Sequence, residues 1–205
     1  MKKILLSSVL GLSFAISGAA QAQSSDNRVF AGPYVGAYGG YGWTEADTNV
    51  GVDIEPDGAD YGLYAGFKAD SLLDSTINRA GTSLTGALEI HYGWSGADDN
   101  VNGVSFEKEN EFGVSFRPGL GFFNNDVVDF NPYAIIGYRR TEYEGSFAGT
   151  TLDEDFDGFE LGVGTELISH NNIGVRADYT HVWYGEENGF DPDEDNIRLG
   201  VGYHF

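Results

Sequence analysis

AGPYVGAYGGYGW, residues 31–43, alternates between two kinds of side chain. Val35, Ala37, Tyr41 and Trp43 fall at odd positions, whereas the even positions from 34 on hold tyrosine and glycine. Successive side chains of a β-strand point to opposite faces of the sheet, so the odd residues would share one face. The stretch therefore predicts a β-strand with one apolar face that ends in a tryptophan.

Alternation of this kind recurs along the rest of the chain and gives about eight candidate strands. Each is about ten residues long, the length that a tilted strand needs to cross a lipid bilayer. A soluble β-sandwich would show the same period, so periodicity alone leaves both architectures open. The candidate strands are residues 34–43, 60–68, 84–94, 111–120, 134–141, 158–167, 173–180 and 197–205.

The second face of these strands carries charges of both signs in nearly equal number, six acids and five bases. A sandwich would leave such a face in water, whereas a small closed barrel would enclose it, and enclosed charges must pair. We therefore predict an all-β fold, a closed antiparallel transmembrane β-barrel of about eight strands with up-and-down topology. The predicted lumen charge network comprises Glu89, Glu111, Arg117, Arg139, Glu160, Arg176, Asp178 and Arg198, together with Asp60, Lys68 and Glu166.

Three tryptophans fall on the apolar face at the ends of strands that run in one direction: Trp43, Trp94 and Trp183. Indole rings favour the membrane–water interface, so we predict that they form an aromatic girdle on the outer side. The connections on that side are long and acidic, and they would form extracellular loops at residues 44–59, 95–109, 144–156 and 185–195. The three connections on the opposite side cover residues 70–83, 122–131 and 169–172. The last two of these are shorter, as periplasmic turns should be.

The N-terminus has the pattern of a secretory signal peptide. Lys2 and Lys3 precede an apolar core at residues 4–16, and Ala20-Gln21-Ala22 provides a cleavage site. The apolar core is shorter than the roughly 20 residues of a membrane-spanning helix. The sequence thus predicts a signal peptide at residues 1–22 and a barrel domain at residues 23–205. The chain contains no cysteine, so neither a disulfide nor a lipid-modified N-terminal cysteine is available.

Together with AGPYVGAYGGYGW, the segments NPYAIIGYR (residues 131–139) and LGVGYHF (residues 199–205) resemble the small outer-membrane β-barrel superfamily. That group includes the OmpA-type transmembrane domain, OmpX-like proteins and the opacity or porin-family surface proteins of Gram-negative bacteria. The resemblance implies export through the signal peptide to the cell outer membrane. It also implies that Val201, Tyr203 and Phe205 form the C-terminal signal read by the barrel-assembly machinery.

The formal charge of −21, or −23 without Lys2 and Lys3, argues against a nucleic-acid partner. Two acid-rich segments, at residues 152–157 and 191–196, hold the oxygen ligands that Ca²⁺ prefers, but neither has the spacing of an EF-hand. The two segments are either solvated surface or a Ca²⁺ site, and no other cofactor is expected. In a weaker form of cation binding, their carboxylates would share divalent cations with the phosphates of lipopolysaccharide. The candidate Ca²⁺ ligands are Asp191, Asp193, Asp195, Asp153 and Asp155.

The sequence offers no nucleophile paired with a base, so we predict that the protein is not an enzyme. YTHVWYG, residues 179–185, resembles the histidine-bearing strand of outer-membrane lipid A deacylases, but the serine needed two residues after His181 is replaced by Trp183. The leading hypothesis is a structural and surface-interaction protein that contacts outer-membrane lipids, lipopolysaccharide and an extracellular ligand. A narrow porin-like channel is the alternative, and a lipid-modifying enzyme comes third.

Overall fold

The computed structural model describes residues 31–48, 57–70, 82–101, 104–123, 128–147, 150–185 and 190–205. These ranges contain strands and no helix, so none of them provides a helix long and apolar enough to cross a membrane. The predicted signal peptide at residues 1–22 lies outside the described residues. The strands are β1 Gly32–Thr48, β2 Asp57–Asp70, β3 Thr82–Ser95, β4 Asp98–Val101, β5 Val104–Phe122, β6 Val128–Phe147, β7 Thr150–Ser169, β8 Ile173–Tyr184 and β9 Phe190–His204.

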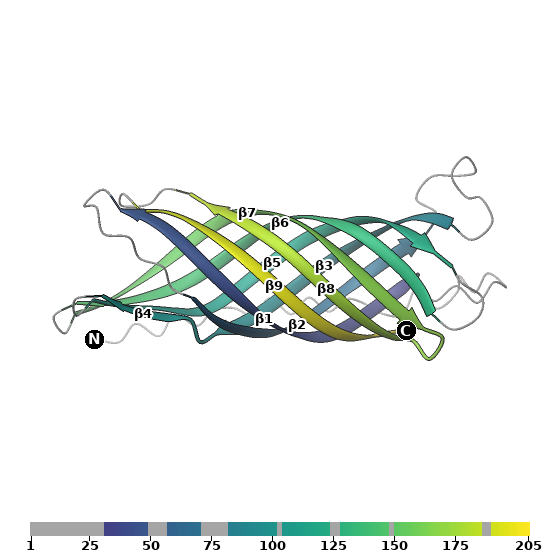
Figure 1. Ribbon diagram of the computed structural model, residues 1–205, viewed down its shortest axis with the longest axis horizontal. Coiled ribbons are helices and arrows are strands. Elements are labelled where there is room, and N and C mark those ends of the chain that lie inside the picture. Colours follow the sequence, from purple (N-terminus) through teal and green to yellow (C-terminus); the bar gives the residue numbers. More distant parts are fainter. Residues whose placement is uncertain are drawn as a thin grey trace, which may run out of the picture.

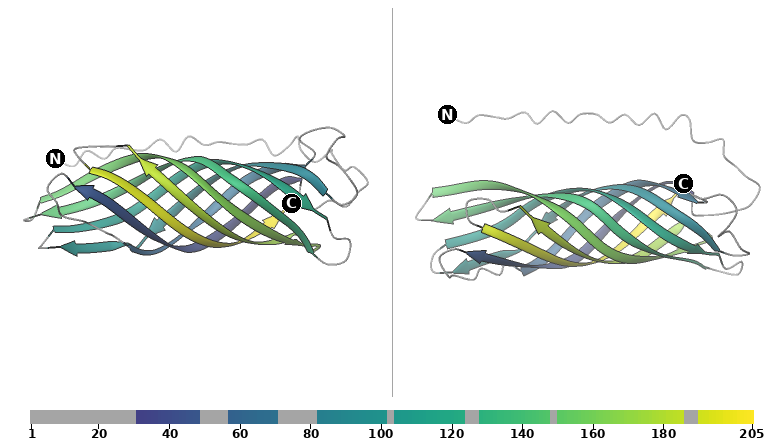
Figure 2. Two further views of the ribbon diagram at one scale, coloured as in Figure 1. Left: turned by 45° about the horizontal axis from the view of Figure 1, so that its top comes forward. Right: turned by 90° about the horizontal axis from the view of Figure 1, so that it is seen from above.

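The strands close into an antiparallel barrel, because β1 pairs with both β2 and β9 (Figure 1). The short β4 continues β3 after a break at Gly96 and Ala97, because β3 and β4 both pair with β5. These two strands together form one element of the barrel wall. The barrel therefore has eight wall elements in up-and-down order, and the two further views show the same tilted cylinder (Figure 2). The prediction of a closed, eight-stranded antiparallel barrel is confirmed.

The two faces of each strand differ in burial as the alternation predicts. In β8 every even residue from Gly174 to Tyr184 is buried, while the odd residues are exposed or half-buried. On β6, where the sequence is least regular, Ile135 and Arg139 are fully buried and Ile136 is 42% exposed. Most of the large apolar residues thus face outward, and most of the polar and charged residues line the lumen, where Ile135, Ile168 and Val182 are apolar exceptions.

Glycines on the inner face make room for tyrosines of the neighbouring strands. A Cβ atom at Gly36 would lie 2.2 Å from the ring of Tyr64, and one at Gly62 would lie 2.6 Å from the ring of Tyr38. No other residue leaves that space, so tyrosines on β1 and β2 can fold across the lumen. The inner glycines therefore allow bulky side chains to fill a narrow barrel.

The predicted boundaries of the outer connections are wrong, because the strands continue well past the tryptophans. β1 extends to Thr48 and pairs there with Phe190, and Phe147 of β6 pairs with Thr150 of β7. Residues 150–156, predicted as part of a loop, therefore belong to a long hairpin. The sequence prediction ended the strands near the tryptophans, whereas backbone pairing continues beyond them and inward side chains such as Tyr143 and Phe156 remain buried there.

At the opposite end, the turn between β7 and β8 is short, as predicted. Asn172 adopts a positive φ of 65°, its backbone N–H donates to Ser169 O over 2.9 Å, and its side-chain amide donates to His204 O over 2.9 Å. Asparagine tolerates this left-handed conformation better than most residues. Most of the predicted connection at residues 70–83 lies outside the described residues.

Candidate functional site: the filled lumen and the outer rim

Most of the basic residues point into the lumen. The chain has nine lysines and arginines besides Lys2 and Lys3 of the predicted signal peptide, and six of these nine are buried in the lumen. They face eight buried carboxylates. The buried bases are Lys68, Lys108, Arg117, Arg139, Arg176 and Arg198, and the buried acids are Asp60, Glu89, Glu111, Asp129, Glu160, Glu166, Asp178 and Glu194. Every residue of the predicted lumen network is among them.

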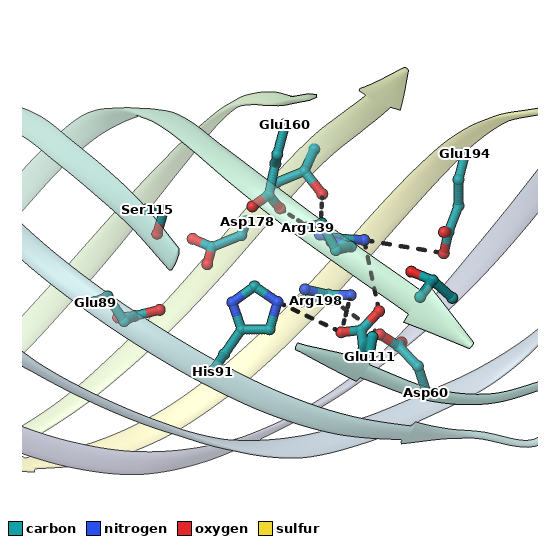
Figure 3. A network of polar contacts seen from close by, with 12 residues as sticks. Asp60, Glu89, His91, Glu111, Ser115, Arg139, Glu160, Asp178, Glu194 and Arg198 are labelled. Atoms are coloured by element: carbon teal, nitrogen blue, oxygen red, sulfur yellow. Dashed lines mark hydrogen bonds and ion pairs between the residues drawn. The ribbon is translucent and has the colours of Figure 1, made fainter. Parts of the chain in front are cut away.

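Glu111 is the hub of the network in the outer half of the lumen (Figure 3). Its Oε1 lies 2.5 Å from Arg198 Nη2 and accepts a hydrogen bond of 2.7 Å from Tyr38 OH. Its Oε2 lies 3.0 Å from Lys108 Nζ and 3.6 Å from Arg139 Nη1. One carboxylate from β5 is thus surrounded by cations from three strands, which is the pairing that a buried charge requires.

Arg139 links this hub to two further carboxylates. Its guanidinium pairs with Glu160, lies 3.9 Å from Glu194 Oε1, and donates to Thr180 Oγ1 over 3.2 Å. The side chain has no exposed surface. Charge-assisted contacts of this kind hold β6 against β7, β8 and β9 across the inside of the barrel.

A second cluster fills the half of the lumen nearer the turn between β7 and β8. Glu89 lies 2.7 Å from Arg117 Nη2 and 2.6 Å from Arg176 Nη1, and Asp178 lies 2.9 Å from Arg117 Nη1. The guanidinium carbon of Arg176 lies 3.5 Å from the centre of the Tyr64 ring, a cation–π contact. This cluster therefore combines ion pairs with aromatic packing.

The two ends of the lumen carry their own pairs. At the end that holds the β7–β8 turn, Glu166 pairs with Lys68 and lies 3.0 Å from His204 Nε2. At the outer end, Lys108 pairs with Glu194, which also accepts a hydrogen bond of 2.5 Å from Tyr184 OH. Ion pairs therefore run from one mouth of the lumen to the other.

Lys108 and Glu194 are lumen residues that the sequence reasoning missed. A bulge between Lys108 and Asn110 shifts the register of β5, so that Lys108 and Glu111 point to the same side despite their odd spacing. Glu194 has the inward parity of Arg198, but it fell within a predicted loop. Extending the parity of β9 outward by two steps would have found Glu194, whereas nothing in the sequence marks the bulge.

Water has little access to the described lumen. Arg139 is 0% exposed, Glu89 and Glu111 are 1% exposed, and Arg117, the most exposed of the buried charges, reaches 8%. Side chains that lined an open aqueous pore would be exposed to water. The described part of the lumen is therefore a packed core of ion pairs, the usual outcome for a barrel of eight strands.

The predicted tryptophans lie toward the outer rim, whereas Val201, Tyr203 and Phe205 of the predicted assembly signal are 57%, 46% and 66% exposed at the opposite end. Trp94 and Trp183 are 38% and 43% exposed on the outer face, where they stack on Tyr61 and Phe159 with ring centroids 6.0 Å apart. Trp43 is half-buried near the outward end of β1. All three lie near the outward ends of outward-running strands, and their role as an interfacial girdle stays a prediction.

The candidate Ca²⁺ ligands are divided between two strands, β7 and β9, that are separated by β8. Asp155 lies 2.5 Å from Arg140 Nη2, and Asp195 lies 2.9 Å from His181 Nδ1. The side chains of Asp153 and Asp191 lie outside the described residues, whereas Asp193 is half-buried. In the part of the chain that the structure describes, no three acidic or histidine side chains are grouped to hold a metal ion.

His181 lies on the outer face, where its side chain contacts Asp195 and Trp183. Besides its contact with Asp195, its ring lies edge-on to Trp183 with centroids 4.3 Å apart. Thr180, the nearest hydroxyl in sequence, points into the lumen. The histidine–carboxylate pair thus has an indole where a nucleophile would be needed.

Residues 8–205 match the protein family described as outer membrane protein beta-barrel domain. The chain belongs to this family. The 25 kDa outer-membrane immunogenic protein of Brucella ovis is 30% identical over 181 residues, which cover 86% of this chain and 78% of the relative. The 22 kDa outer membrane protein of Rhizobium leguminosarum is 28% identical over 133 residues, which cover 58% and 57% of the two chains.

Among solved structures, the barrel resembles Neisserial surface protein A with a TM-score of 0.51. The two share 17% sequence identity, and the match covers 85% of this chain and 98% of the other. At that identity the likeness concerns the fold alone. As a member of the outer-membrane barrel family, the protein lies in the cell outer membrane, and the apolar outer face of the barrel is its lipid-facing surface.

Proposed function

We propose that the protein is a structural anchor whose extracellular extension is an interaction surface. The observation that carries the proposal is the lumen packed with paired charges, since a barrel filled in this way offers rigidity and no passage. The part of the molecule left to meet other molecules is then the extension beyond the membrane, and loops or hairpins on a rigid scaffold are where binding usually resides.

The extension is a sheet built mainly from β5, β6 and β7. β6 and β7 pair without interruption from Phe147 and Thr150 down to the barrel wall. The backbone register pairs Glu142 with Asp155 and Glu144 with Asp153, so acidic positions are paired along the hairpin. Such a surface would favour cationic partners and repel anionic ones. Surface exposure agrees with the word immunogenic in the names of the Brucella relatives.

Orientation can be tested with a pair of epitope tags. A tag inserted between residues 147 and 150 should be detected by antibody on intact cells, because the β6–β7 hairpin lies outside. A matched tag between residues 170 and 171, in the turn of the opposite end, should be detected after the outer membrane is permeabilised. Detection of the second tag and not the first on intact cells would overturn the proposal.

The channel alternative predicts stable single-channel steps in a planar lipid bilayer. A packed lumen predicts none for the wild-type barrel, even at high voltage. If steps do appear and Arg117→Ala alters their size, the lumen conducts and the anchor proposal is wrong.

We propose in addition that the protein catalyses no lipid modification. The support is local: Trp183 occupies the position two residues after His181, and its ring packs edge-on against the histidine. Overexpression should leave the mass spectrum of lipid A unchanged. A lipid A species with one acyl chain fewer, lost again in His181→Ala, would instead establish an enzyme.

Lipopolysaccharide is the proposed neighbour in the outer leaflet, with weakly bound divalent cations between its phosphates and outward carboxylates. Asp157 and Asp195 face outward near the ends of the wall strands, and Arg140 is the basic residue on the described outer face. Removal of divalent cations by a chelator should loosen lipopolysaccharide from the purified protein. Equal retention with and without chelator would refute the bridging role.

A further inference from the structure

The lipid-facing surface of the barrel has a recess over β1 and β2 that the proposed function does not use. It is open to its surroundings and has a volume of about 790 Å³, and its outward lining side chains are aliphatic or aromatic. Ala37 and Ala65 lie at its centre, and Val35, Leu63, Ile90 and Val201 are among the residues around them.

The recess follows from the sizes of neighbouring side chains. Ala37 is opposite Leu63 on β2 and Val201 on β9, and Ala65 is opposite Val35 and Ile90. Side chains directly opposite in an antiparallel pair are close neighbours, so two alanines among larger residues leave a hollow bounded by those residues. On most of the outer face large side chains project instead: Leu199, Leu88 and Val163 are 60–63% exposed.

A hollow of this kind inside a bilayer has to be filled. Water does not fill it, because the outward lining offers polar groups only in the hydroxyls of Tyr92 and Tyr203, and a buried water needs several polar partners. If the recess stayed empty, every atom that lines it would lose dispersion contacts on that side. A second barrel is a poor occupant, since two convex cylinders touch along a line and cannot fill a recess. A flexible acyl chain can follow it, and the recess is continuous with the surface that already contacts lipid.

The position of the recess indicates which leaflet supplies that chain. Ile173, the first residue of β8, and Tyr203, the residue before the end of β9, line one end of the recess. Tyr92 and Phe112 line the other end, one rung from Trp94, so it is the end at Ile173 and Tyr203 that would receive a chain from the periplasmic leaflet. The start of β8 and the end of β9 are on the periplasmic side, as is the start of β1 close to Val35. Tyr203 packs edge-on against Phe205 with centroids 5.2 Å apart, at the depth where aromatic residues meet lipid headgroups.

We propose that this recess binds one acyl chain of a glycerophospholipid from the periplasmic leaflet and retains it when bulk lipid is removed. The site is distinct from the extracellular surface. Its failure would leave the anchor proposal intact, and the reverse also holds, because the two are tested on different parts of the molecule.

The test is native mass spectrometry of the detergent-purified barrel after addition of dipalmitoyl phosphatidylethanolamine. The wild type should retain one phospholipid, and Ala65→Phe, which fills the recess, should lose it. Ala134→Phe is the matched control, because Ala134 is a half-buried, outward alanine on β6, on the opposite wall. It should retain the lipid like the wild type.

Folding of each variant is checked by heat-modifiable gel migration. If Ala65→Phe fails to fold, Ala37→Leu is the milder substitution and should still reduce retention. Equal retention by the folded recess variants and the control would overturn the proposal. So would lipid A that is retained with the same sensitivity to Ala65→Phe, or a wild-type dimer that this substitution dissociates.

Discussion

Replacement of Arg139 by methionine tests the packed lumen at its most buried charge. The guanidinium pairs with Glu160 and lies 3.6 Å from Glu111 and 3.9 Å from Glu194. Glu111 keeps Arg198 and Lys108 after the change, and Glu194 keeps Lys108. Among the described residues, Arg139 is the one basic side chain within ion-pair distance of Glu160. The substitution therefore leaves one buried carboxylate without its partner.

Loss of one partner of a buried ion pair costs about 3–5 kcal/mol in the free energy of unfolding. The adjacent Arg140 provides the control, because it pairs with Asp155 while both side chains are about half exposed. An exposed pair of this kind contributes about 0–1 kcal/mol. Arg140→Met should therefore change the stability of the barrel several-fold less than Arg139→Met, although the two residues are neighbours in sequence.

The assay is urea unfolding of the barrel refolded into lipid vesicles, followed by tryptophan fluorescence. Adding Glu160→Gln to Arg139→Met should recover part of the loss, because it removes the stranded charge. Equal stabilities for Arg139→Met and Arg140→Met would refute the reasoning. So would a double variant less stable than Arg139→Met alone.

Two further predictions concern packing and assembly. A Cβ atom at Gly113 would lie 2.1 Å from His91 Cε1, so Gly113→Ala should destabilise the barrel by about 1–3 kcal/mol in the same urea assay, whereas Gly39→Ala, whose Cβ meets nothing within 3.8 Å, should not. Phe205 is 66% exposed at the end of β9, and as part of the predicted assembly signal its replacement by serine should reduce the amount of heat-modifiable barrel in the outer membrane. An unchanged amount would remove Phe205 from that signal.

The inward charges could be predicted from sequence because their position depends on parity alone. Arg139 and Glu160 occupy inward positions of regular strands, and the structure places both in the lumen. Which acid pairs with which base could not be predicted. Lys68 and Glu166 are 98 residues apart, and they meet because barrel closure and strand stagger bring β2 and β7 across the lumen.

Two other features were beyond the sequence pattern for different reasons. Lys108 points inward because of a bulge, which no residue type in the segment requires. The recess at Ala37 and Ala65 depends on the sizes of side chains from several strands in their final register. Local alternation thus predicts on which face of a strand a side chain lies, whereas the strand register and the bulges determine which side chains touch.

The central claim is that the apolar face meets lipid while the charged face is sealed inside, and a single-cysteine scan of β8 tests it most directly. The chain has no cysteine of its own, so each introduced residue can carry one spin label. Labels at Val175, Ala177 and Tyr179 should be accessible to oxygen dissolved in lipid, and labels at Arg176, Asp178 and Thr180 should be accessible to neither oxygen nor a water-soluble relaxant. Access of the water-soluble relaxant to the even positions, or loss of the alternation, would contradict the account.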